Sequence, residues 1–264
     1  RCLSDWSSDV CSSDLGPNAA ARILTPDRRI QQVVNNYRQI SFNFGPTLLS
    51  WMQRAAPGIY QAILEADRES RAERGGHGNA IAQAYNHIIL PLANRRDRIT
   101  QVRWGLCDFL LRFGRRSEGM WLPETAVDVE TLEILADHGL KFTILSPYQA
   151  RLVRPIGHDA WTRVEGGHVD PTRPYLVRLP SGRSIVVFFY DGPIAKAIAF
   201  ETGLASPQEL LRRLEGGYHT GREHEEILNV AVDGETFGHH RKGGDEVLAA
   251  ALAEAGERGM VLTN

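Results

Sequence analysis

The stretch SIVVFFY, residues 184–190, carries apolar or aromatic side chains at every position after its first serine. A strand with one face in water alternates polar and apolar residues, whereas a strand buried on both faces is a continuous apolar run. The stretch ILNVAV, residues 227–232, has a similar character. Strands of this kind occur in parallel sheets that are covered by helices on both sides, so the two stretches predict an α/β fold.

Working outward from these strands, strand-like runs alternate with segments of helical periodicity. The run before residue 184 forms a predicted hairpin over 174–192, with its turn at Pro180–Gly182. Further strands are predicted at 39–45, 118–122, 141–147, 227–234 and 260–264. Helices are predicted at 46–55, 59–74, 97–114, 127–139, 206–217 and 244–259, with Ser206 as an N-cap. An open doubly wound sheet and a barrel both fit this alternation.

The composition narrows the classes of function. The chain has 264 residues, 42% of them hydrophobic and 23% charged, with a formal net charge of −2. These values are typical of a soluble globular protein and provide no basic surface for nucleic acid. No apolar run approaches the roughly 20 residues of a membrane span. No glycine-rich dinucleotide or phosphate-binding motif follows a strand. We therefore expect neither nucleic acid nor a membrane as a partner.

The first 15 residues differ from the rest of the chain. The stretch SDWSSDVCSSDL, residues 4–15, resembles the one-frame translation of a widely used sequencing-adapter oligonucleotide. We therefore expect residues 1–15 to be an artefact and residues 16–264 to form one domain. No secretory signal is present, and outside the first 15 residues Cys107 is the remaining cysteine. Both observations predict a cytoplasmic location.

Several predicted strands end in polar residues: Asn43, Glu124, Ser146, Asp191 and Asp233. The carboxyl ends of parallel strands meet at one edge of a sheet, which is where ligands bind in such folds. Taken singly, each carboxylate has an ordinary structural explanation as a helix cap or turn residue. Taken together, Glu124 beside Trp121 and Asp233 near Phe237 combine two acids with aromatic rings. Cleavage of a glycosidic bond requires one carboxylate at the anomeric carbon and another to protonate the leaving oxygen.

Two alternatives use the same residues. Asp233, His239, His240 and His87 could assemble the metal site of a polysaccharide deacetylase or a metal-using glycosidase. The sequence lacks the H-x-x-x-H or H-x-H spacing of such ligands, and adjacent histidines on an extended segment point to opposite faces. A barrel that only binds glycan would keep the aromatic rings without needing the two acids to face each other.

Four segments carry a resemblance to glycoside hydrolase family 57, which contains α-glucan-active amylases, 4-α-glucanotransferases, branching enzymes and amylopullulanases. GMWLPETAVD (119–128) and VAVDGETFGHH (230–240) resemble the third and fourth characteristic segments of that family. GHGNAIAQAYNHIILPLANRRD (76–97) resembles the second segment, and SFNFGPTLLSWM (41–52) extends the similarity. The closest likeness is to a bacterial branch whose members often carry an additional uncharacterised C-terminal region.

The resemblance implies a (β/α)7 barrel and a retaining mechanism that needs no metal and no other cofactor. It implies that Glu124 is the nucleophile and Asp233 the general acid/base. The implied substrate is an α-glucan polysaccharide or oligosaccharide, cleaved or transferred. Residues of the motifs and of a neighbouring strand end are candidate substrate contacts: His87, Trp121, Glu235, His239 and Asp191.

The chain departs from the family pattern at both ends. The first segment, a His-x-Pro on the first barrel strand, is absent, and residues 1–15 stand in its place. The fifth segment, which follows the last barrel strand, does not occur before Asn264. We therefore expect a barrel that is incomplete at its N-terminal strand, and weak or no activity from this chain alone. The pattern predicts no particular oligomeric state.

Overall fold

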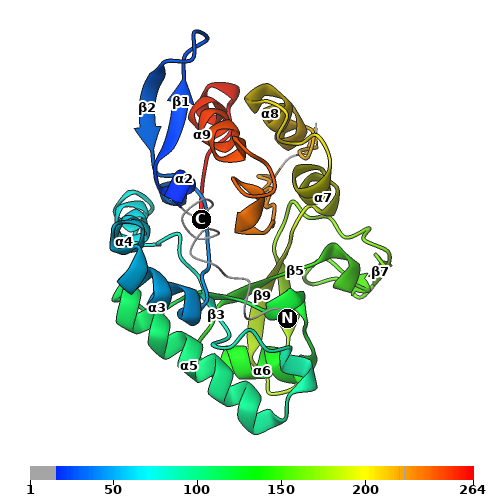
Figure 1. Ribbon diagram of the computed structural model, residues 1–264. Coiled ribbons are helices and arrows are strands. Elements are labelled where there is room, and N and C mark those ends of the chain that lie inside the picture. Colours follow the sequence, from blue (N-terminus) through cyan, green and yellow to red (C-terminus); the bar gives the residue numbers. More distant parts are fainter. Residues whose placement is uncertain (1–15, 220, 223) are drawn as a thin grey trace.

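A computed structural model of the chain describes residues 16–219, 221–222 and 224–264 (Figure 1). The predicted artefact at residues 1–15 lies outside the described residues. No helix in the described part of the chain combines the length and the apolar character that a membrane crossing needs.

The centre of the molecule is a five-stranded sheet with the order β3-β4-β5-β9-β8. Its strands are β3 (Ala82–Gln83), β4 (Gly119–Trp121), β5 (Phe142–Leu145), β9 (Ser184–Phe189) and β8 (Tyr175–Arg178). The first four are parallel, and β8 is antiparallel to β9. The predicted hairpin is confirmed: Leu179 and Arg183 close its turn, and Gly182 adopts the positive φ of 84° that the turn requires.

Extended segments continue the sheet at its margins without forming regular ladders. Of the strand predicted at 39–45, a single parallel bridge between Phe42 and Ala80 remains. The strand predicted at 227–234 is held to the end of β9 by Asn229, whose backbone oxygen accepts from the Asp191 amide and whose side chain donates to the Phe189 oxygen, both at 2.9 Å. One of these two hydrogen bonds comes from a side chain, so the segment does not pair with β9 as a regular strand. The prediction of a strand at 227–234 was therefore wrong in detail.

The strand predicted at 260–264 is also wrong: among the described residues no strand pairs with this segment, and Val261 is 87% exposed. Strands and helices nevertheless alternate as predicted, with parallel strands at the centre and helices outside. The fold is α/β and of the barrel type, and the sheet that the described residues form is open.

The predicted helices are present, and all but the one at 46–55 have shifted ends. They are α3 (Pro46–Ala55), α4 (Pro57–Glu73), α5 (Arg95–Phe113), α6 (Val129–Asp137), α8 (Pro207–Glu215) and α9 (Gly244–Ala255). Side chains of Asn94, Asp128 and Ser206 cap the first turns of α5, α6 and α8 by accepting backbone N–H bonds. The Ser206 cap confirms its prediction. Helix α7 (Gly192–Phe200) was not predicted; Asp191, expected as a strand-end residue, is its N-cap.

Two hairpins outside the central sheet were also not predicted. One joins β1 (Ala21–Leu24) to β2 (Ile30–Val34), and the other joins β6 (Leu152–Val153) to β7 (Thr162–Arg163). The remaining short elements are α2 (Gly16–Ala19), η2 (Asn36–Arg38) and single-turn 3₁₀ helices in the loops.

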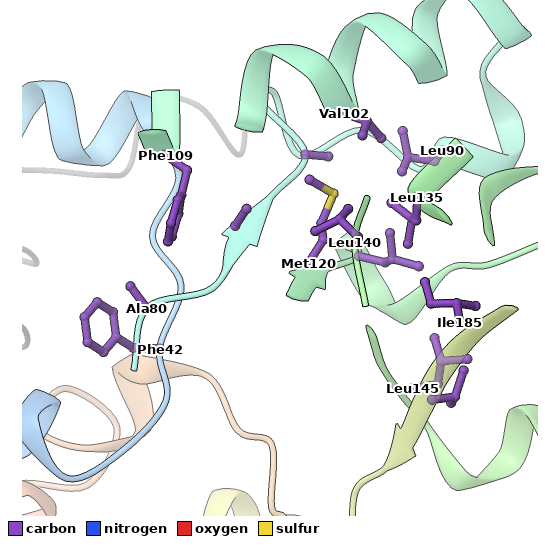
Figure 2. Packing of buried hydrophobic residues seen from close by; sticks show 14 of the residues in the cluster. Phe42, Ala80, Leu90, Val102, Phe109, Met120, Leu135, Leu140, Leu145 and Ile185 are labelled. Atoms are coloured by element: carbon purple, nitrogen blue, oxygen red, sulfur yellow. The ribbon is translucent and has the colours of Figure 1, made fainter. Parts of the chain in front are cut away.

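In the described part of the chain, buried side chains form two hydrophobic clusters. The larger one surrounds the sheet, with Met120, Leu90 and Leu135 fully buried between strands and helices (Figure 2). The smaller one lies among α7, α8 and α9, which gather at the top of Figure 1, away from α5 and α6. Ile40, Val230 and Val232 pack against the smaller cluster, so the 227–232 segment connects the sheet to the upper helices.

Close backbone packing fixes β3 against α5. A side-chain carbon on Gly105 would lie 2.1 Å from the backbone oxygen of Gln83, so only glycine fits there. Nearby, the Tyr85 amide donates to the Gln101 backbone oxygen, and the Asn86 amide donates to the Gln101 side chain at 2.7 Å. These contacts determine where the loop after β3 leaves the sheet.

Candidate active site

The carboxyl ends of β3, β4, β5 and β9 lie at one edge of the sheet because these strands are parallel. Glu124 follows β4 on the single turn η4 (Pro123–Thr125). Its side chain is 74% exposed. The turn starts from the buried Leu122 and Pro123, whose backbone oxygens accept from the amides of Thr125 and Ala126. A rigid base therefore presents an exposed carboxylate.

Glu124 has an unusual backbone conformation. Its φ is 55° and its ψ is 21°, and the following Thr125 has a φ of 53°. This left-handed region is uncommon for residues other than glycine and most unusual for a β-branched residue such as threonine. Strain of this kind persists where the surrounding structure enforces it, and it occurs preferentially at functional sites.

His87 approaches Glu124 from the loop after β3. Its Nε2 lies 3.4 Å from Glu124 Oε1. His87 also has a positive φ, 53°, and its side chain is 53% exposed. The sequence places these residues in separate motifs, and the pairing of β3 with β4 brings them together.

Arg98, at the start of α5, joins the two loops that carry this pair. Its guanidinium donates to the backbone oxygens of Pro91 and Ala93, both at 2.8 Å. It also forms a 2.6 Å ion pair with Asp128, the N-cap of α6, and its side chain is 9% exposed. Sequence reasoning missed this residue. A signal existed, because a cation in the first turn of a helix opposes the helix dipole and needs another explanation.

The environment of Asp128 keeps it ionised. Burial alone would raise the pKa of its carboxyl group, but hydrogen bonds from the Thr131 hydroxyl and amide, together with Arg98, hold that pKa below its usual value. The loop from Glu124 to α6 therefore ends at a charged and hydrogen-bonded anchor.

Polar side chains from neighbouring strand ends extend this network. Gln149, on η5 (Pro147–Gln149) after β5, donates to the Thr125 backbone oxygen at 2.7 Å. Its other amide atom accepts from the Ser146 backbone at 2.9 Å. At the β3 end of the same edge, the side-chain amide of Asn43 donates to the Gln83 side chain at 2.5 Å. Two of the polar strand-end residues, Asn43 and Ser146, thus position other side chains.

Asp233 ends the 227–232 segment and precedes the turn η6 (Gly234–Thr236). Its side chain is exposed, and its backbone oxygen accepts from the Thr236 amide at 3.0 Å. Below it, the buried Phe237 packs in the smaller hydrophobic cluster, and the Asn18 side chain donates to the Phe237 oxygen at 2.7 Å. This loop is therefore anchored in the protein and presents its carboxylate to solvent.

The remaining predicted contacts lie as follows. Glu235 Oε2 is 3.6 Å from His240 Nε2, and the rings of His239 and His240 meet edge to face with centroids 5.0 Å apart. Trp121 ends β4 in a half-buried position opposite Gln83. Asp191 is half-buried, and its carboxylate accepts from the Ile194 amide at the start of α7.

The structure thus brings His87 to Glu124 and Glu235 to His240. The described residues show no hydrogen bond or ion pair between either member of the first pair and Asp233. Nor do three or more His, Cys, Asp or Glu side chains within residues 16–219, 221–222 and 224–264 gather in a group that could hold a metal ion. The assignment of Glu124 and Asp233 as a catalytic pair therefore stays a prediction.

Comparison with known proteins supplies the family. The model of glycosyl hydrolase family 57 matches residues 22–263. The chain belongs to glycosyl hydrolase family 57. Family 57 membership accounts for the motifs around Glu124 and Asp233 and for the barrel-type arrangement of strands and helices.

Individual relatives are distant in sequence. Alpha-amylase 1 of Dictyoglomus thermophilum is 22% identical over 199 residues, which cover 75% of this chain and 26% of that protein. The chain therefore spans about a quarter of the length of this curated relative.

Solved structures share the fold. An exo-type maltose-forming amylase from Pyrococcus sp. ST04 superposes with a TM-score of 0.66 at 20% identity, covering 86% of this chain and 35% of that one. A family 57 branching enzyme from Pyrococcus horikoshii gives a TM-score of 0.62 at 15% identity, covering 100% and 66%. A 4-α-glucanotransferase from Thermococcus litoralis gives 0.59 at 19% identity, covering 86% and 32%.

Proposed function

We propose that the protein cleaves α-glucans with retention of configuration, by hydrolysis or by transfer, with Glu124 as nucleophile and Asp233 as general acid/base. The observation that carries this proposal is the conformation of Glu124. Glu124 presents an exposed carboxylate on a strained turn that starts from buried residues, and the imidazole of His87 lies 3.4 Å away. Folding alone does not require this arrangement.

The relatives support the substrate class. Their names describe an alpha-amylase, a maltose-forming amylase, a 4-α-glucanotransferase and a branching enzyme. These four activities share one bond change, the exchange of a substituent at the anomeric carbon of an α-glucoside. A retaining pair of carboxylates performs that change with either water or a sugar hydroxyl as the acceptor.

The first step forms a covalent intermediate. A Glu124 carboxylate oxygen attacks the anomeric carbon while the bond to the leaving oxygen breaks, and Asp233 transfers its proton to that oxygen. In the second step the Asp233 carboxylate takes a proton from water or from an acceptor hydroxyl, whose oxygen then displaces Glu124. When its Nε2 carries a proton, His87 donates a hydrogen bond to the carboxylate of Glu124 and orients the nucleophile. The two inversions together give net retention.

The test uses the natural protein that contains this sequence, with amylose as substrate. Proton NMR of the first product should show the α-anomer. Glu124→Gln and Asp233→Asn should each lower kcat by about a thousandfold or more, whereas Glu257→Gln, an exposed glutamate on the turn η7 (Gly256–Arg258), should behave as wild type. Wild-type turnover in either active-site variant would contradict the assigned roles.

Chemical rescue separates the two roles. With 4-nitrophenyl α-maltoside, whose leaving group needs no protonation, azide should restore turnover of Asp233→Ala and give the α-glycosyl azide. Azide should give the β-glycosyl azide with Glu124→Gly, because only one inversion then occurs. The reversed products would exchange the assignments.

The metal-dependent alternative has its own test. We expect activity to survive dialysis against EDTA, since both proposed steps use side chains alone. Loss of activity that zinc restores would instead favour the deacetylase-like or metal-using glycosidase reading.

A further inference from the structure

The segment between β5 and β8 carries two exposed aromatic rings that the proposed chemistry does not use. We call residues 147–167 the aromatic arm; it contains η5 and the β6–β7 hairpin. In Figure 1 the hairpin lies at the right-hand margin, beyond β5. Tyr148 is 71% exposed and Trp161 is 57% exposed. Exposed rings of this size are a site for recognition when they are held in place.

Each ring is supported from one side. A side-chain carbon on Gly167 would lie 3.1 Å from the ring of Tyr148, so the bare backbone of this glycine packs against the ring. The guanidinium of Arg154 lies over Trp161, 4.7 Å from its centroid. Both residues nevertheless remain more than half exposed.

The arm is anchored to the protein and to the candidate active site. Ala150 and Val164 are buried in the larger hydrophobic cluster, and Arg151 forms a 3.0 Å ion pair with Glu165 across the hairpin. Gln149, next to Tyr148 in the chain, donates to the backbone oxygen of Thr125, the residue after Glu124. Tyr148 is therefore fixed beside the loop that carries the proposed nucleophile, and Trp161 lies on the anchored hairpin of the same arm.

We infer that Tyr148 and Trp161 form a platform that binds glucosyl units of an α-glucan remote from the cleaved bond. The axial C–H groups of a pyranose ring pack against the negative face of an aromatic ring, and a supported ring loses little entropy on binding. This inference rests on the proposed function and specifies which length of substrate the site prefers. A second copy of the chain covering the same rings is the alternative that the test must separate.

The binding test uses the Glu124→Gln chain, so that the sugar is not consumed, with maltoheptaose and maltose as probes in calorimetry. Trp161→Ala and Tyr148→Ala should each raise the Kd for maltoheptaose about tenfold, and much more than the Kd for maltose. Trp161→Phe should restore most of the affinity, because it keeps a ring. Trp104→Ala serves as control, since Trp104 is similarly exposed at 52% but lies on α5.

The outcomes separate the two ideas. If both alanine variants bind maltoheptaose with the same Kd as the Glu124→Gln chain that keeps both rings, the platform is refuted while the proposed function stands. If Trp161→Ala instead abolishes self-association in sedimentation and leaves the Kd for maltoheptaose unchanged, the rings bind a second copy and the inference is wrong. A different result would contradict the proposed function: the natural protein would still turn over amylose when it carries Glu124→Gln.

Discussion

His87 and Glu124 face each other at 3.4 Å, and both hold a left-handed backbone conformation, with φ values of 53° and 55°. They belong to loops after different strands, so the contact exists only because β3 and β4 are adjacent and parallel. Two neighbouring strained residues with complementary side chains indicate that the loops are shaped for this contact.

We expect His87→Asn to lower kcat on amylose by about 10- to 100-fold, with a smaller change in KM. Asparagine tolerates the left-handed backbone, so the variant removes the imidazole and leaves the loop in place. The reason for the loss is that a nucleophile without its hydrogen-bond partner samples unproductive orientations. The control is His138→Gln, at the end of α6, which should show wild-type kinetics. An unchanged kcat in His87→Asn would remove His87 from the site.

Thr125→Gly should raise the free energy of unfolding by up to about 1 kcal/mol. The left-handed conformation costs an L-residue about 1–2 kcal/mol, and glycine removes this cost. Glycine also has greater conformational entropy in the unfolded state, which offsets part of the stabilisation. Thr100→Gly, in the ordinary helical backbone of α5, should lower the same free energy by a few tenths of a kcal/mol. Urea denaturation measures both. Destabilisation by Thr125→Gly would show that the turn is not strained.

Arg98→Met should lower the free energy of unfolding by about 3 kcal/mol and also reduce kcat. The change leaves the Asp128 carboxylate and two loop carbonyls without their buried donor, and it disconnects the loops that carry His87 and Glu124. Arg98→Lys should recover only part of both losses, because an ammonium cannot reproduce the fork of donors. Arg95→Met, which breaks an exposed pair with Glu130, should cost less than about 1 kcal/mol. Equal effects at the two arginines would contradict a bridging role for Arg98.

The stability of the protein should fall in acid through Asp170. Burial would raise the pKa of this carboxyl group, but hydrogen bonds from the Thr172 hydroxyl and amide and from Arg222, with the charge of Arg173, hold the pKa far below its ordinary value. The depressed pKa means that Asp170 contributes its full stabilisation above its unfolded pKa of about 3.9 and loses it as the pH falls further. The backbone oxygen of Thr172 accepts from the Ile227 amide, so this network anchors the segment that leads to Asp233.

Urea titrations at pH 7, 4 and 2.5 would measure this effect. The wild type should exceed Asp170→Asn in stability at pH 7, and the difference should shrink toward pH 2.5. Glu257→Gln, at an exposed glutamate, should track the wild type at every pH. A difference between wild type and Asp170→Asn that stays constant with pH would show that packing, and not ionisation, makes Asp170 stabilising.

The local sequence determined the secondary structure wherever one residue pattern dominates. The continuous apolar run predicted β9 and the helical periodicity predicted α5 and α6, so each element could be predicted from the chain alone. The expected burial of β9 on both faces was met only in part, because Ile185, Val187 and Phe189 are buried whereas Val186 and Phe188 are half-buried. The motifs around Glu124 and Asp233 likewise indicated the family before any coordinates. In contrast, residues 227–232 have the composition of a strand, but their pairing depends on Asn229 meeting the end of β9.

Only the tertiary structure decided how the site residues are used. Asp191 and Asp233 have the same strand-end context in the sequence, yet the first caps α7 and the second stands exposed directly before η6. The contact of Glu124 with His87 and the bridge through Arg98 join segments that are distant along the chain. Local propensity cannot encode such contacts, because their geometry comes from the order of parallel strands and from the packing of α5 against them.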